Sequence, residues 1–355
     1  MFRLRYGADK GIIPYPDLGR NASLGNKAVA LISGGLDSIL AAKLVMDQGY
    51  DVTGLYCTSA FSKSYGREED TPAVAVSRAI GIDLRVHDLG MPYIDLIRNP
   101  RHGYGKNSNP CIDCKIFMLN EAKAVMQELG APFVVTGEVL GQRPMSQRRD
   151  TLHVIERDAG LRGLILRPLS ATVLPPTRAE QEGLIDRGGL LGISGRGRTV
   201  QFRLAERYGI QGFSTPAGGC LLTDKNFSEK LRDLFRTKES VSLEDIRLLT
   251  VGRHFKLDPG LRIVVGRDRK ENEVLTDIAS HGFHLFVPHG FTGPVALLSG
   301  TPTAEIKQAV GRLIITYSKQ VPGQARRIRF GSELFDPGEP LPIRSLGLVR
   351  LGTDH

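Results

Sequence analysis

Two groups of residues have types and spacing that suit chemistry. The first is the segment 33–38, which reads SGGLDS and follows a short apolar run. Glycines in a turn between a strand and a helix let the backbone approach a phosphate, and amides at the helix N-terminus point at the anion. The segment lacks the Gly-Lys-Ser/Thr of a Walker loop and the later glycines of a dinucleotide fingerprint. We expect a phosphate site of another class, although a purely conformational turn would use the same residue types.

The second group consists of cysteines. Cys111 and Cys114 lie at the predicted start of a helix that follows Pro110, and Cys220 follows a Gly-rich turn. A positive helix end favours thiolates and hence metal ligation. Three cysteines without a nearby histidine suit a four-iron cluster with one open iron better than a structural zinc site, which is closed and four-coordinate. Zinc and inert buried thiols are the alternatives, and Cys57 fits a small core residue better than a fourth ligand.

The elements that must position these groups alternate along the chain. Short β-rich runs and helical patterns follow one another from Lys27, which predicts a parallel sheet covered by helices. The predicted strands cover residues 28–32, 52–57, 84–89 and 133–136, and the predicted helices cover 39–48, 72–80 and a segment from Pro110 to Gly130. That last helix has one apolar stripe, formed by Met118, Ala122, Val125 and Leu129. Ligands collect at the carboxyl ends of parallel strands, so we expect the site there.

The second half of the chain has a different composition. Thr177 and Glu180 have the spacing of a capping box, and a basic run follows that contains Arg196, Arg198, Arg203 and Arg207. From about residue 240, short β-like runs broken by Gly and Pro accompany one helical segment, 304–318, and predict a smaller β-rich α+β domain. The expected division is an N-terminal extension (1–26), a nucleotide domain (27–225) and a small C-terminal domain (240–355).

Composition limits the classes of function. The 355 residues include 47 Lys+Arg and 38 Asp+Glu, a net charge of +9, which favours a polyanionic partner such as nucleic acid. With 41% hydrophobic residues the chain is an ordinary folded protein and not a disordered one. No apolar run has the length of a membrane span, and the N-terminus lacks the apolar region of a signal peptide. We expect a cytoplasmic protein without a membrane partner.

The SGGLDS segment resembles the pyrophosphate (PP) loop of the N-type ATP pyrophosphatases, enzymes that cleave ATP between the α and β phosphates. This resemblance covers about residues 27–222 and implies an α/β, Rossmann-like fold of the adenine nucleotide alpha hydrolase type, with helices on both faces of the sheet. It implies that Asp37 helps to bind the Mg²⁺ that neutralises the leaving pyrophosphate. It also implies that the β and γ phosphates of ATP are held by Ser33, Gly34, Gly35 and Ser38.

Within that superfamily the chain resembles the tRNA-thiolating branch. The TGE-x-LGQ pattern that starts at Thr136 is similar to the 4-thiouridine synthases, and the pair Cys114 and Cys220 is similar to the catalytic cysteines of the 2-thiouridylases. Where cluster-independent 2-thiouridylases carry an aspartate, this chain has Cys111, which resembles the iron-sulfur-dependent thiolases. The resemblance thus implies catalytic roles for Asp37, Cys114 and Cys220, a [4Fe-4S] cluster on Cys111, Cys114 and Cys220, and nucleotide contacts from Thr136, Gly137, Gln142 and Arg143.

The activity implied by the resemblance is that of an ATP-dependent tRNA uridine sulfurtransferase. Such an enzyme adenylates a uridine carbonyl and replaces its oxygen by sulfur, with release of AMP and pyrophosphate. The implied partners are tRNA and a sulfur donor, either inorganic sulfide or a separate persulfide carrier; a homodimer stays open. The alternatives are a ligase or thiolase acting on a small molecule and a non-catalytic RNA-binding protein. The modified uridine, its position 2 or 4, and the direction of sulfur transfer are left open.

Basic and acidic residues outside the motifs have two interpretations each. Arg167 is expected near the α phosphate, and Glu138 near Mg²⁺ or the ribose, with plain ion-pair roles as the alternative. Arg326, Arg327 and Arg329 suit an RNA backbone, as they would suit a solvated basic surface.

Overall fold

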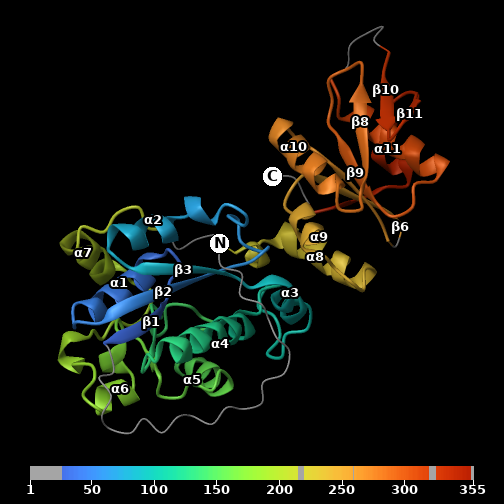
Figure 1. Cartoon of the computed structure of the whole chain (residues 1–355). Coiled ribbons are helices and arrows are strands. Elements are labelled where there is room, and N and C mark those ends of the chain that lie inside the picture. The colour runs from blue at the N-terminus through green and yellow to red at the C-terminus, as the bar shows by residue number, and fades with distance from the viewer. Residues whose placement is uncertain (1–25, 215–219, 259, 320–324, 353–355) are drawn as a thin grey trace.

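The computed structural model describes residues 26–214, 220–258, 260–319 and 325–352 of the chain. They form two sheets, one with five strands and one with seven. Figure 1 shows the two sheets in separate bodies, with helices α8 and α9 between them. Nearly all of the predicted N-terminal extension, and the Gly-rich turn before Cys220, lie outside the described residues.

The first sheet is parallel and has the strand order β3-β2-β1-β4-β5. Its strands are β1 (Lys27–Leu31), β2 (Asp51–Thr58), β3 (Asp83–Asp88), β4 (Val134–Thr136) and β5 (Ile165–Leu166). The chain runs outward from β1 to β3 and then returns to place β4 on the other side of β1. This reversal is the switch point of a doubly wound fold, where ligands bind beyond the carboxyl ends of the strands.

Helices cover both faces of this sheet, as Figure 1 shows. The alternation along β1 sends Ala28 and Ala30 to one core and Val29 and Leu31 to the other. The first core includes residues of α1 (Leu36–Met46), α2 (Pro72–Ala79) and α7 (Thr199–Arg207). The second includes residues of α4 (Cys111–Leu129) and α5 (Arg149–Asp158). The predicted Rossmann-like fold is confirmed.

The predicted apolar stripe of α4 is only partly right. Its most buried residues are Leu119, Ala122 and Met126. Met118, Val125 and Leu129 lie beside this line and are partly buried against the same core. Helix α4 also contacts α3 (Gly90–Arg98) and α5. It therefore needs apolar residues on its two flanks as well as on the side that faces the sheet. The helix ends as predicted at Gly130, which has a left-handed φ of 65°.

The second sheet is antiparallel and has the order β11-β10-β8-β9-β7-β6-β12. Its strands are β6 (Arg253–Asp258), β7 (Leu261–Val265), β8 (His284–His289), β9 (Ala296–Ser299), β10 (Arg327–Phe330), β11 (Glu333–Phe335) and β12 (Val349–Leu351). Helix α11 (Ala304–Thr316) packs in one of its cores and α10 (Arg269–Ala279) in the other. This is the predicted β-rich α+β architecture.

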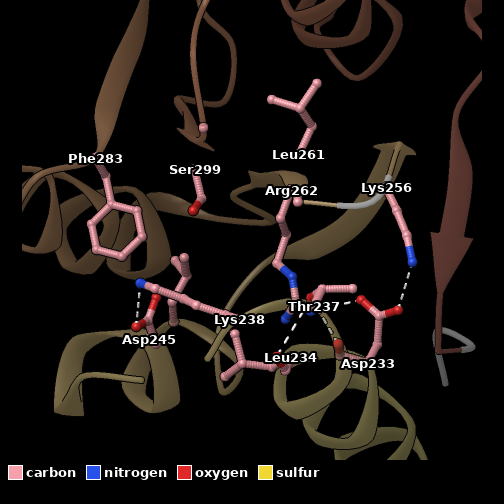
Figure 2. Close-up of a pocket in the computed structure, with 13 residues that line it drawn as sticks. Asp233, Leu234, Thr237, Lys238, Asp245, Lys256, Leu261, Arg262, Phe283 and Ser299 are labelled. Carbon is pink, nitrogen blue, oxygen red and sulfur yellow. Dashed lines mark hydrogen bonds and ion pairs between the residues drawn. The ribbon is translucent and has the colours of Figure 1, made fainter. Parts of the chain in front are cut away.

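Helices α8 (Lys225–Thr237) and α9 (Leu243–Leu248) join the two sheets. Asp233 of α8 is 5% exposed and binds Lys256 of β6 at 2.9 Å and Arg262 of β7 at 2.8 Å. Figure 2 shows both cations reaching from the sheet toward this carboxylate. They border a cavity of about 160 Å³ that Phe283 and Ser299 also line. The buried ion pairs fix α8 against the second sheet.

Helix α6 (Arg178–Gln181) begins with the predicted capping box of Thr177 and Glu180, although the helix is only four residues long. None of the helices in the described ranges combines the length and the apolar content that crossing a bilayer requires.

Candidate nucleotide and thiol site

The phosphate-loop candidate, residues 33–38, connects β1 to α1 at the carboxyl edge of the parallel sheet. Ser38 Oγ donates to the Gly35 carbonyl at 2.8 Å and accepts from the Ser33 amide at 3.2 Å. The N-cap residue of α1 is Gly35, which has no side chain that could cap the helix. The first amides of the helix therefore keep their capacity to bind an anion.

Close backbone contacts require glycine at two positions, one in the phosphate loop and one packed against it. Gly34 has a φ of +72°, and a Cβ there would lie 2.8 Å from the amide nitrogen of Ala73 in α2. Gly137 directly follows β4, and a Cβ there would lie 2.4 Å from the Ser38 nitrogen and 2.5 Å from the Asp37 carbonyl carbon. The structure thus places Gly137 against the loop. A nucleotide contact from Gly137 was expected from the sequence, and this position is compatible with it.

Asp37 forms an ion pair that the sequence analysis missed. Arg198, which immediately precedes α7, places Nη2 3.3 Å from Asp37 Oδ2. Within the described part of the chain, Asp37 Oδ1 and Arg198 Nε are buried without a hydrogen-bond partner. Unpaired buried polar atoms are costly, so they mark a place where a ligand would supply the missing partner. A carboxylate oxygen suits Mg²⁺ and a guanidinium suits a phosphate, so this pair fits Mg²⁺ and ATP.

Glu138 and Arg167 form a buried ion pair behind the loop. Glu138 is 2% exposed, and Oε2 accepts from Arg167 Nε at 3.0 Å and from Thr136 Oγ1 at 3.1 Å. Lys115 lies 3.8 Å from its other oxygen, and Arg167 also binds Glu156. Burial acts to raise the pKa of Glu138, but Lys115 and Arg167 together lower it. The two side chains thus form an ion pair, while Glu138 Oε1 and Arg167 Nη2 are buried without a hydrogen-bond partner in the described part of the chain, so the expected ligand contacts stay a prediction.

Gln142 and Arg143 lie in a tight turn. The Gly141 amide donates to the Gln147 carbonyl at 2.7 Å, and the Gln147 amide donates to the Arg143 carbonyl at 3.1 Å. Among the residues that the structure describes, no hydrogen bond joins the Gln142 side chain to the phosphate loop. Arg143 is exposed. Burial raises the pKa of the Cys220 thiol, and the positive charge of Arg143 acts in the opposite direction. Arg143 therefore lies within electrostatic reach of the cysteines.

Tyr93 of α3 contacts one of the three candidate cysteines, and the other two are near enough to act on it by their charge. Tyr93 Oη donates to Cys114 Sγ at 2.9 Å, and Asn109 Nδ2 donates to Cys111 Sγ at 3.3 Å. Burial raises the pKa of Tyr93, and the charges of all three cysteines raise it further. Burial also raises the pKa of Cys114 to about 12, against the opposing effect of the Tyr93 hydrogen bond.

These thiols lie at the same sheet edge as the phosphate loop. Helix α4 leads into β4, which is parallel to β1, so its first turn lies at the carboxyl edge. The backbone of Cys220 forms an isolated β-bridge with that of Ser62, and Ser62 lies shortly after the end of β2. Ser214, six residues before Cys220 in the numbering, donates its amide to the Gly34 carbonyl at 2.8 Å. The cysteines and the loop therefore lie along one edge of the sheet.

The cysteines are not arranged as a ligand set. Among the residues that the structure describes, no three His, Cys, Asp or Glu side chains are grouped to hold a metal ion. Three sulfur donors without an intervening nitrogen ligand do fit an iron-sulfur cluster by their chemistry. Burial raises the pKa of Cys57, which packs beside both cores that α4 contacts, in keeping with a core role.

Comparison with known proteins gives two family matches. Residues 24–172 match the family model described as "Thiamine biosynthesis protein (ThiI)", and residues 252–335 match "NFACT protein RNA binding domain". The chain is 33% identical over 134 residues to a "Probable tRNA sulfurtransferase" of Methanosarcina acetivorans, covering 38% of this chain and 31% of that protein. It is 29% identical over 121 residues to a "tRNA-specific 2-thiouridylase MnmA" of Sulfurimonas denitrificans, covering 33% and 36%.

Among solved structures, a 4-thiouridine synthetase–RNA complex with bound ATP is 22% identical with a TM-score of 0.37, covering 63% of this chain and 52% of that one. The chain spans about a third of the length of the two curated relatives. A tRNA sulfurtransferase and a tRNA-specific 2-thiouridylase are thus among the curated relatives. The predicted resemblance to the tRNA-thiolating branch is therefore confirmed.

Proposed function

We propose that the protein is an ATP-dependent tRNA uridine sulfurtransferase, with residues 27–225 as the catalytic domain and residues 240–355 as an RNA-binding domain. The observation that carries this proposal is the phosphate loop at the switch point, with three thiols at the same sheet edge. The similarity of the first domain to a tRNA sulfurtransferase and the match of residues 252–335 to an RNA-binding domain support it.

ATP would bind with its phosphates on the loop. The amides at the start of α1 and the Ser33 and Ser38 hydroxyls would hold the β and γ phosphates. The free oxygen of Asp37 would bind Mg²⁺, and Mg²⁺ would neutralise charge on the leaving pyrophosphate. Arg198 would turn from Asp37 to a phosphate oxygen, since its guanidinium has an unpaired N–H.

The reaction would proceed in two steps. The uridine carbonyl oxygen attacks the α phosphorus, the bond to the β phosphate breaks, and pyrophosphate leaves. A sulfur nucleophile then attacks the activated ring carbon, and AMP leaves with the original oxygen. The base has to leave its stack to reach the loop, because a stacked base is sterically inaccessible.

tRNA would dock by its phosphates. The chain carries a net charge of +9, and β10 presents Arg327 with an exposed side chain. Contacts of this kind supply affinity that falls steeply with salt, without reading sequence.

For sulfur delivery we propose that Cys111, Cys114 and Cys220 hold a [4Fe-4S] cluster. A cluster with three protein ligands leaves one iron able to bind sulfide. Within the chain, the Tyr93 and Asn109 hydrogen bonds would orient the Cys114 and Cys111 sulfur atoms. The test is an anaerobic iron and sulfide assay on the alanine variants of the three cysteines, with Cys57→Ala as the matched control. We expect iron loss in the three and not in the control, and iron retained by all three contradicts the assignment.

The activity is tested by incubating the purified protein with ATP labelled at the α phosphate, sulfide and tRNA. We expect AMP formation that depends on tRNA and is lost in Asp37→Asn. AMP formed equally well without tRNA would favour a small-molecule substrate. Absence of AMP under all conditions would favour a non-catalytic RNA-binding protein.

A further inference from the structure

The outer face of α7 has no role in the function described so far. Phe202 is 51% exposed and Val200 is 45% exposed, while Gln201 and Ala205 of the same helix face the core. Arg203 is exposed as well. We call Val200, Phe202, Arg203 and the neighbouring Phe213 the α7 platform. An aromatic ring that is half exposed beside cationic side chains is a candidate interaction surface.

The platform is attached directly to the phosphate loop. The rings of Phe202 and Phe213 have centroids 6.5 Å apart, and Phe213 precedes Ser214, which donates to the Gly34 carbonyl at 2.8 Å. Arg198 lies over the Phe202 ring at 5.6 Å and pairs with Asp37 at 3.3 Å. Two independent contacts thus place the half-exposed Phe202 ring, through the partly buried Phe213 and through Arg198, near the loop.

The charge of the platform suits a polyanion. Arg196 and Arg203 are exposed, and neither has an ion-pair partner among the residues that the structure describes. Glu206 is the acidic residue of α7. Aromatic rings that stack on bases, surrounded by guanidiniums that contact phosphates, are the means by which proteins bind single-stranded nucleic acid.

We propose that the α7 platform binds the single-stranded RNA segment that contains the reacting base. Phe202 stacks on a base, and Arg203 contacts a backbone phosphate. This inference rests on the proposed function, since it names the surface that receives the RNA at that site. A second copy of the chain is a less suitable occupant, because it would bring the same arginines toward each other beside the phosphate loop.

The chain contains no tryptophan, which makes stacking directly measurable. Phe202→Trp introduces a single indole at the platform, and Val86→Trp introduces one at a 46% exposed position on β3 as the matched control. We expect tRNA to quench the fluorescence of the first variant strongly and that of the control weakly. Equal quenching of the two overturns the proposal.

Affinity provides the second readout. Stacking on one base is worth about 1–3 kcal/mol, so Phe202→Ala should weaken tRNA binding by about 5- to 140-fold in fluorescence anisotropy, with Val86→Ala unchanged. Phe202→Trp should retain affinity, which separates stacking from folding. Arg203→Gln should lower the slope of log affinity against log salt by about 1.

The outcomes distinguish this proposal from the proposed function. If the wild type binds tRNA and Phe202→Ala binds equally well, the platform is not the RNA surface and the function stands. If Phe202→Ala changes the oligomeric state in light scattering without changing tRNA affinity, the face is a contact between copies and the proposal is overturned. If the wild type does not bind tRNA, the proposed function fails and this inference fails with it.

Discussion

Gly137 offers the sharpest test of how the phosphate loop is held. In Gly137→Ala the new Cβ would lie 2.4 Å from the Ser38 nitrogen, whereas ordinary contact begins at 3.4 Å, so the loop must retreat by about 1 Å. The φ of Gly137 is not in the left-handed range, so alanine is excluded by contact and not by backbone conformation. A displacement of about 1 Å in a catalytic site lowers the rate on the order of 100-fold.

The assay is tRNA-dependent AMP formation, with ATP affinity measured by calorimetry. We expect the rate of Gly137→Ala to fall on the order of 100-fold and ATP binding to weaken, because the amides at the start of α1 no longer face the phosphates. Thermal unfolding reports the accompanying overpacking, for which about 1–3 kcal/mol is expected.

Gly197→Ala is the matched control, because a Cβ at Gly197 has no atom within 4 Å and its φ is ordinary. We expect wild-type activity from this variant. A Gly137→Ala enzyme with the rate and ATP affinity of the wild type would refute the close packing of Gly137 on the loop as a requirement for the site.

Three further predictions concern stability and thiol chemistry. Asp233→Asn leaves Arg262 without its buried partner and should cost about 3–5 kcal/mol in urea unfolding, whereas Asp277→Asn removes an exposed pair and should cost about 1 kcal/mol or less. Although burial acts to raise the pKa of Asp233, its ion pairs lower it below the ordinary 3.8, so its contribution is present above that pH and is lost as pH falls. Wild type and Asp233→Asn should therefore converge in stability as the pH falls below about 4, toward the lowered pKa of the folded state, in unfolding titrations, and a constant difference contradicts the ion pairs. Because the pKa of Cys114 is raised to about 12, iodoacetamide at pH 8 should alkylate it more than about tenfold slower than free cysteine in the metal-free protein, as followed by mass spectrometry.

The elements with strong apolar patterns could be predicted from the sequence. The strand at 28–32 and the helix after Pro110 each have a continuous apolar signal, and their positions at the switch point follow from the βα alternation. Helix α5 was not predicted, because its sequence RDTLHVIERD is largely charged and its buried residues are few. Helix α7 was missed for the same reason, and its arginines were interpreted only as a basic run.

The candidate site could be predicted as far as local motifs reach. The loop residues and the three cysteines follow from short patterns, and the structure brings these segments to one sheet edge. The pairing of Asp37 with Arg198 joins residues 161 positions apart, and no local pattern contains that contact. The burial of Glu138 with Arg167 likewise depends on tertiary packing, so the sequence could name both residues but could not choose between a ligand contact and an ion pair.

The central claim is transfer of sulfur to tRNA uridine with consumption of ATP. Its most direct test is nucleoside mass spectrometry of unmodified tRNA after incubation with the anaerobically prepared protein, ATP, Mg²⁺ and sulfide. The proposed function predicts a thiouridine, formed in step with AMP, that is absent without ATP and absent with Asp37→Asn. AMP formation from protein and tRNA without any thionucleoside would contradict it.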